Sequence, residues 1–207
     1  MRHNKRGYPL LTNKIPLTIL LLVKAAPPSL QDNTADIDRL KAALAASLPN
    51  RLIGYQLHIP FARLALIAAR FRAAGFKGYA VMHVLFAQLE LIDFMPEKPQ
   101  LLPAIALDLG STHLEASLLD LLTGTPLAHG NRLNLQVQYG ADILTRIHYA
   151  EKKDGLEMLQ QAVISSINSL ITPLCRDANL SSQDILALSI AGNTTMIHLL
   201  LGLKPNT

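Results

Sequence analysis

The chain has 207 residues, of which 50% are hydrophobic, 16% charged and 5% aromatic, and its formal net charge is +4. This composition favours a folded globular protein over a disordered one, and the chain is long enough for one domain, or two small ones, with a real core. Part of the positive charge lies in the first six residues, and with no motif or interleaved aromatic residues beside it we expect no nucleic-acid partner.

Cysteine usage and apolar runs exclude further classes. Cys175 is the single cysteine, so the chain can form no internal disulfide and cannot hold a four-thiolate iron–sulfur cluster. The longest apolar run, Leu17–Val23, is much shorter than the roughly 20 residues of a membrane-spanning helix, so we expect no membrane association. A reduced thiol is consistent with a cytoplasmic location, which we expect here.

The first part of the chain predicts a small α/β domain. We expect a basic tail over residues 1–13 and the domain itself over residues 14–95. Apolar periodicity and breakers predict, in order, a strand over 15–23, helices over 36–48 and 60–74, and two strands over 79–86 and 88–94 that could form a hairpin.

The second of these helices has recognisable ends. Pro60 suits a first helical turn, and Gly75 suits a C-terminal cap. We expect one buried face, made of Phe61, Leu64, Ala65, Ala68 and Phe71.

A polar, proline-containing stretch over residues 96–102 indicates a linker to a second domain over residues 103–207. There the pattern predicts strands over 104–107, 115–119 and 127–135, helices over 141–150 and 156–174, a strand over 185–190 and a helix over 196–201. Strands and helices in this order indicate a mixed sheet covered by helices, so the fold class is α/β.

The segment Asp108–Thr112 joins two of these strands and carries the first candidate site. Gly110 permits close backbone approach, and N–H groups in such a turn can bind an anion, with the hydroxyls of Ser111 and Thr112 as further donors. Asp108 could hold a hydrated Mg²⁺ ion. The segment therefore predicts a binding site for nucleotide phosphates, although a purely structural hairpin would have the same residues.

Two later segments are also candidates. Gly192, Asn193 and Thr194 follow a buried strand and precede a helix, where α/β proteins often contact ligands, and the alternative is an ordinary helix cap. Asp142 and Arg146 are four residues apart on a predicted helix, which indicates either a surface ion pair or a role at the cleft.

Three stretches together resemble a known family. Residues 105–124 are similar to the first phosphate-binding hairpin of the superfamily of actin, sugar kinases, acetate kinase and heat-shock chaperones. Residues 139–147 and 191–202 resemble signatures of one branch, the ATP-dependent reductive activators of corrinoid proteins, which are ferredoxin-linked. Residues 26–40 are similar to the small middle domain that precedes the ATPase domain in that branch, so the likeness covers about residues 14–205.

The resemblance implies a fold and a function. It implies a middle domain followed by an incomplete ribonuclease-H-like ATPase domain of the actin and sugar-kinase type. Such activators use ATP to drive reduction of Co(II) corrinoid proteins to Co(I), with electrons from an iron–sulfur domain. Asp108, Gly110, Ser111, Thr112, Gly192, Asn193 and Thr194 would then bind ATP with Mg²⁺.

Departures from the family pattern qualify these expectations. The cluster-binding cysteines and the later nucleotide-binding loops of the family have no counterpart here, so we expect a fragment that is incomplete as a catalyst. The expected partners are a corrinoid protein and a separate ferredoxin-type or C-terminal ATPase piece. The alternative is a non-catalytic interaction module, or an inactive fragment of such an activator.

Overall fold

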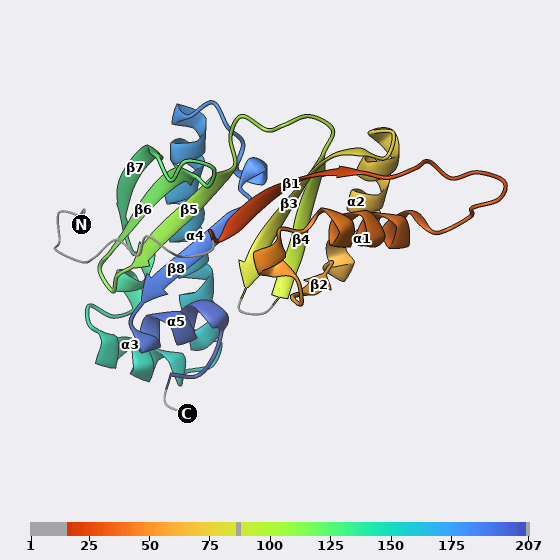
Figure 1. The fold of residues 1–207 in the computed structure, drawn as a ribbon. Coiled ribbons are helices and arrows are strands. Elements are labelled where there is room, and N and C mark those ends of the chain that lie inside the picture. The colour runs from red at the N-terminus through yellow and green to blue at the C-terminus, as the bar shows by residue number, and fades with distance from the viewer. Residues whose placement is uncertain (1–15, 86–87, 206–207) are drawn as a thin grey trace. The chain divides into compact units, whose positions relative to one another are not determined.

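A computed structural model describes residues 16–85 and 88–205. The chain divides between Gln100 and Leu101 into two compact units, drawn together in Figure 1 and described separately below. The expected tail over residues 1–13 and the first residue of the expected strand at Ile15 lie outside the described residues.

Unit 1 contains a four-stranded sheet in the order β1-β3-β4-β2. Its strands are β1 (Thr18–Lys24), β2 (Gln56–His58), β3 (Lys77–Leu85) and β4 (Gln88–Met95). β3 pairs antiparallel with β1 and with β4, which confirms the predicted hairpin. The short β2, which the sequence did not predict, adds parallel to the edge of β4.

Two helices cover one face of this sheet. They are α1 (Asp36–Ser47) and α2 (Phe61–Ala73), with the short 3-10 helix η1 (Asn50–Leu52) between them. Alternate residues of each strand meet the helices in the core, as strand periodicity requires. Phe71 of α2 lies at the centre, with edge-to-face contacts to Phe76 and Phe94.

The predicted apolar face of α2 was wrong in part. Phe61 is 92% exposed and Ala65 is also exposed, whereas Ile67, absent from the prediction, is fully buried. Apolar residues occur on most sides of α2, between its three arginines, so the spacing in the sequence fits more than one buried face. Pro60 lies just before the helix, and Gly75, with φ of 63°, follows its end as expected.

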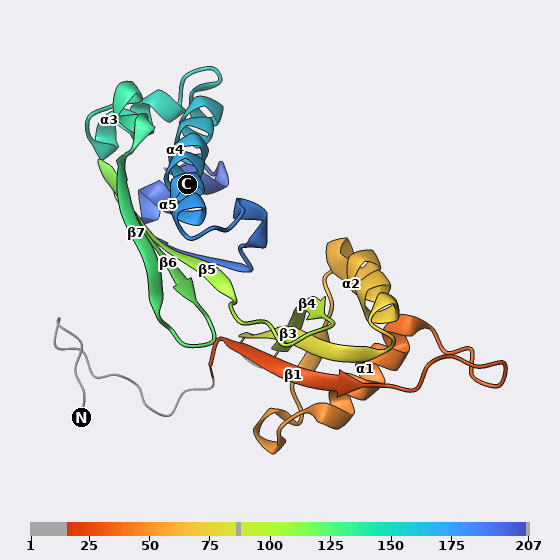
Figure 2. The same cartoon turned by 90° about the horizontal axis from the view of Figure 1, so that it is seen from above.

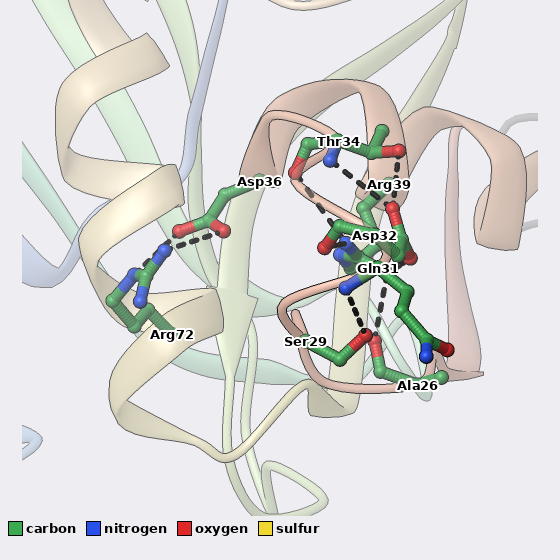
Figure 3. A network of polar contacts seen from close by, with 8 residues as sticks. All are labelled: Ala26, Ser29, Gln31, Asp32, Thr34, Asp36, Arg39 and Arg72. Carbon is green, nitrogen blue, oxygen red and sulfur yellow. Dashed lines mark hydrogen bonds and ion pairs between the residues drawn. The ribbon is translucent and has the colours of Figure 1, made fainter.

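The connection between β1 and α1 extends away from the rest of unit 1 in both ribbon views (Figures 1 and 2). One arginine side chain holds this connection in place. Arg39, 8% exposed, donates to the carbonyl of Ala26 and, at 2.7 Å, to the Asp32 carboxylate (Figure 3). Asp32 also accepts two bonds from Thr34. The Arg39 guanidinium, followed by these bonds, holds the pKa of Asp32 well below its usual range. The loop is therefore ordered by polar contacts.

Unit 2 contains a second four-stranded sheet, in the order β7-β6-β5-β8. Its strands are β5 (Pro103–Leu109), β6 (His113–Asp120), β7 (Pro126–Leu133) and β8 (Ala187–Gly192). The first three form an antiparallel meander, and β8 pairs parallel with β5. The predicted strands are confirmed, although β8 begins two residues later than expected.

Helices cover one face of this sheet (Figure 2). They are α3 (Ile143–Ala150), α4 (Gly155–Asp177) and α5 (Thr194–Leu201), with the 3-10 helices η2 (Leu135–Tyr139) and η3 (Ser182–Asp184). The core joins alternate strand residues such as Leu107 and Leu114 to Leu159, Met196 and Leu199. The α/β fold class is confirmed, with two mixed sheets.

A proline inside α4 is accommodated by a contact from the sheet. Pro173 has no N–H, so the carbonyl of Ser169, four residues earlier, loses its helical donor. The Arg132 guanidinium of β7 donates to that carbonyl at 3.1 Å. α4 therefore continues past the proline to Asp177.

Within the described ranges, 16–85 and 88–205, no helix is long and apolar enough to cross a membrane.

Candidate functional site

The turn between β5 and β6 is the first part of the candidate site. Asp108 lies within β5, one residue before its end, and its side chain is exposed. Gly110, Ser111 and Thr112 form the turn itself. A Cβ atom on Gly110 would lie 2.3 Å from the carbonyl oxygen of His113, so the fold of the turn already requires glycine.

The second part is the passage from β8 into α5. Gly192 ends β8, and Thr194 begins α5. The side-chain oxygen of Asn193 accepts a 2.9 Å bond from the N–H of Met196, so Asn193 is the N-cap of the helix. Capping accounts for this oxygen, while Gly192, Asn193 and Thr194 are all exposed.

The sheet brings these two parts together. β5 and β8 are neighbours and run parallel, with Leu109 opposite Gly192 in the register. The carboxyl ends of parallel strands lie at the same edge of a sheet, so the turn and the start of α5 are side by side there. This edge is where ligands bind in open α/β sheets.

Main-chain donors are free at this edge. Among the residues that the structure describes, none accepts a hydrogen bond from the N–H of Ser111 or of Thr112. In α5, the bond from Ile197 to the Asn193 carbonyl is the first of the helix, which leaves Thr194 and Thr195 without intrahelical acceptors. Such N–H groups, together with the hydroxyls nearby and the helix dipole, suit an anion.

Carboxylates lie on the sheet face beside the turn. Asp108 is directly opposite Glu115 of β6, and both side chains are exposed. Their neighbours Leu107, Leu109 and Leu114 point into the core, so the two carboxylates lie on the face away from the helices. Directly opposite residues of an antiparallel pair have Cβ atoms about 5 Å apart, which suits a hydrated divalent cation between them. Across the described residues, no group of three or more His, Cys, Asp or Glu could hold a metal directly.

Two buried polar residues near the turn were missed by sequence reasoning. Asn134, fully buried between β7 and η2, donates to the carbonyl of Gly110 at 3.0 Å and accepts from the N–H of Gln136 at 3.0 Å. Gln136, also fully buried, donates to the carbonyl of Leu159 in α4. The only sign of this arrangement in the sequence was Asn134, a residue that favours turns, followed two positions later by the polar Gln136, and this pattern is weak evidence.

Of the two alternatives for Asp142 and Arg146, the surface ion pair was wrong. Asp142 is the N-cap of α3 and accepts two bonds from Thr145, which, led by the main-chain N–H, lower the pKa of its carboxyl. Arg146 is fully buried: its Nε donates to the Gly140 carbonyl, and one terminal nitrogen lies 3.5 Å from the sulfur of Met196. Burial lowers the pKa of this guanidinium.

Three further side chains, those of His113, His198 and Cys175, show no ligand-binding arrangement. His113 is exposed at the start of β6, and His198 is half-buried on α5. Cys175 is buried in α4, and burial raises the pKa of its thiol, as expected for a structural cysteine.

Comparison with known proteins agrees with this architecture. A family model described as the RACo middle region matches residues 103–207, and one described as the RACo linker region matches residues 12–99. The chain belongs to the RACo family. Its β5–β6 turn and the start of α5 both lie within the RACo middle region.

Two relatives extend the comparison. The corrinoid activation enzyme RamQ of Eubacterium limosum is 35% identical over 132 residues, which are 62% of this chain and 22% of RamQ. The solved structure of a reductive activator for corrinoid, iron-sulfur protein matches 95% of this chain over 31% of its own length, with a TM-score of 0.78 and 29% identity. The chain thus spans less than a third of the length of either relative.

Proposed function

We propose that this chain serves in an ATP-dependent reductive activator of corrinoid proteins, and that unit 2 binds the phosphates of Mg-ATP. One observation carries the second part: the parallel pairing of β5 and β8 places two sets of free N–H groups at one edge of the sheet. The names of its relatives, a corrinoid activation enzyme and a reductive activator, support the first part.

The residues have separate roles in this proposal. The N–H groups of Ser111 and Thr112, and those that open α5, contact phosphate oxygens. Asp108 holds Mg²⁺ through water, with Glu115 beside it. Gly110 shapes the turn. The chain contributes positioning and charge stabilisation to phosphoryl transfer, which needs several loops at once.

The redox step lies outside this chain. One electron from an iron–sulfur cluster reduces Co(II) of the corrinoid to Co(I). Cys175 alone cannot bind such a cluster, so a ferredoxin-type domain or subunit supplies the electron. The binding partner of this chain is then a corrinoid protein.

Nucleotide binding is tested by NMR titration of ATP, ADP and AMP, each with and without Mg²⁺. Contacts to phosphate compete with strong hydration, so we expect a millimolar dissociation constant for ATP, on the order of −4 kcal/mol. Binding should weaken from ATP to AMP, and amides of residues 110–112 and 193–195 should shift most. The turn at the other end of β6, residues 121–124, is an internal control and should not respond.

The metal role of Asp108 is tested in the same titration. Asp108→Asn should remove most of the Mg²⁺ dependence, because it removes the charge that holds the hydrated ion. Asp38→Asn, which removes an exposed carboxylate of α1, is the matched control and should leave it unchanged. Equal responses to all three nucleotides, or none, would exclude this site as a phosphate site.

The corrinoid partner is tested by pull-down of a Co(II) corrinoid protein with and without ATP. Capture that depends on ATP supports the proposal. Capture that is indifferent to ATP favours a non-catalytic interaction module, and no capture at all contradicts the partner assignment.

A further inference from the structure

Asn134 links the turn between β5 and β6 to the start of η2, beneath the candidate site. Its side-chain amide donates to the Gly110 carbonyl at 3.0 Å, and its own N–H donates to the Thr112 carbonyl at 2.8 Å. Its side-chain oxygen accepts from the N–H of Gln136 at 3.0 Å. The residue is fully buried, so water does not compete for these bonds.

These bonds fix the direction of the turn's N–H groups. In a planar trans peptide, the carbonyl of one residue and the N–H of the next point in opposite directions. The Gly110 carbonyl points inward to Asn134, so the N–H of Ser111 in the same peptide plane points away from the buried side chain. The described structure holds no acceptor for that N–H, which is therefore presented to a ligand.

We propose that Asn134 is a positioning residue for phosphate binding, which orients the Ser111 N–H toward the bound anion through the Gly110 carbonyl. The inference rests on the proposed function of the turn. Gly110 has the conformational freedom of glycine, so without the tether its peptide plane could rotate and direct the carbonyl, rather than the N–H, at the phosphate.

Asparagine is the side chain that suits both of these bonds. An aspartate could accept from Gln136 but could not donate to the Gly110 carbonyl, and a leucine of similar size could do neither. Asn134→Asp therefore keeps the cap of η2, which needs an acceptor, but removes the tether of the turn, which needs a donor. Asn134→Leu removes both.

Gln136 offers a matched control for a purely structural role. It lies two residues further on, in η2, and is equally buried, but its side chain donates to Leu159 of α4 and not to the turn. Gln136→Leu should therefore lower the stability of unit 2 in the same region while leaving the turn's carbonyls tethered.

The experiment compares the wild-type chain, Asn134→Leu, Asn134→Asp and Gln136→Leu by ATP titration, followed by amide NMR, and by urea unfolding. In the wild type the Ser111 amide should show one of the largest shifts with ATP. Both Asn134 variants should bind ATP about tenfold more weakly, the loss expected for one misdirected hydrogen bond to a charged group. Gln136→Leu should bind within about twofold of the wild type, whatever its stability.

Several outcomes would overturn the inference. A folded Asn134→Leu that binds ATP like the wild type would show that the tether is not needed. If that variant fails to fold, wild-type binding that leaves the Ser111 amide unshifted contradicts the inference equally. A wild-type chain that binds no nucleotide would contradict the proposed function and this inference together. Loss of ATP binding only in the Asn134 variants would support both.

Discussion

The contact between Arg132 and α4 predicts an energetic coupling that can be measured. Pro173 leaves the Ser169 carbonyl without its helical donor, and Arg132 supplies one from β7 at 3.1 Å. Arg132→Met removes this hydrogen bond but retains much of the side chain's apolar stem. Replacing Pro173 with alanine restores the N–H at position 173, so the carbonyl no longer needs the arginine.

The expected magnitude follows from the exposure of the site. Arg132 and Ser169 are both exposed, so water can partly replace the lost donor. We therefore expect Arg132→Met to lower the free energy of unfolding by about 1 kcal/mol in the wild-type background. In the Pro173→Ala background the same substitution should cost close to zero, which gives a coupling of about 1 kcal/mol between the two positions.

The assay is urea unfolding of the four proteins of this cycle, followed through resonances of unit 2, because two compact units need not unfold together. Arg176→Met is the control, since Arg176 is an exposed arginine of α4 whose side chain pairs with its neighbour Asp177. An equal cost of Arg132→Met in both backgrounds would refute the idea that the arginine replaces the missing helical bond.

Two further predictions concern Asp120 and Arg39. Burial by itself raises the pKa of Asp120, but bonds from the N–H groups of Leu102 and Leu122 and from the Thr123 hydroxyl outweigh it and lower that pKa. Asp120 therefore stabilises the fold fully at pH values above the pKa that its carboxyl has in the unfolded chain. This contribution is lost as the pH falls through the lower pKa of the folded chain. Asp120→Asn should lower the free energy of unfolding, measured with urea, by about 1 kcal/mol at pH 7 and by less at acid pH, and an equal loss at both would contradict this. Arg39→Met should speed amide exchange and proteolysis of residues 26–34. Arg72→Met, which removes the ion pair with Asp36 and the contact of the guanidinium with the Phe76 ring, should not. Unchanged protection in Arg39→Met would mean that the loop is held by other contacts.

Much of the secondary structure could be predicted, because hydrophobic periodicity is a local property. The helix of unit 2 from Gly155 to Asp177 and the meander of β5 to β7 have strong apolar repeats between turn residues. The orientation of α2 could not be predicted, since its apolar residues occur on most sides of the helix, between three arginines, and so define no unique buried face in the sequence.

The candidate site was predicted as two separate segments and not as one place. Nothing local to residues 108–112 or 192–194 indicates that β8 pairs parallel with β5, because strand pairing depends on the whole sheet. Asn134 and Arg146 were missed or misassigned for a related reason. A single polar residue in a strand or helix pattern is usually exposed, and only tertiary contacts place these two in the interior.

The parallel pairing of β5 with β8 has a consequence for how the chain folds. The meander of β5, β6 and β7 involves neighbours in sequence and can form early, whereas β8 must close a long loop that contains α3 and α4. The turn after β5 can then exist before the start of α5 is beside it. A ligand that contacts both segments would bind only after this last strand has joined the sheet, and it would slow unfolding by holding β8 in place.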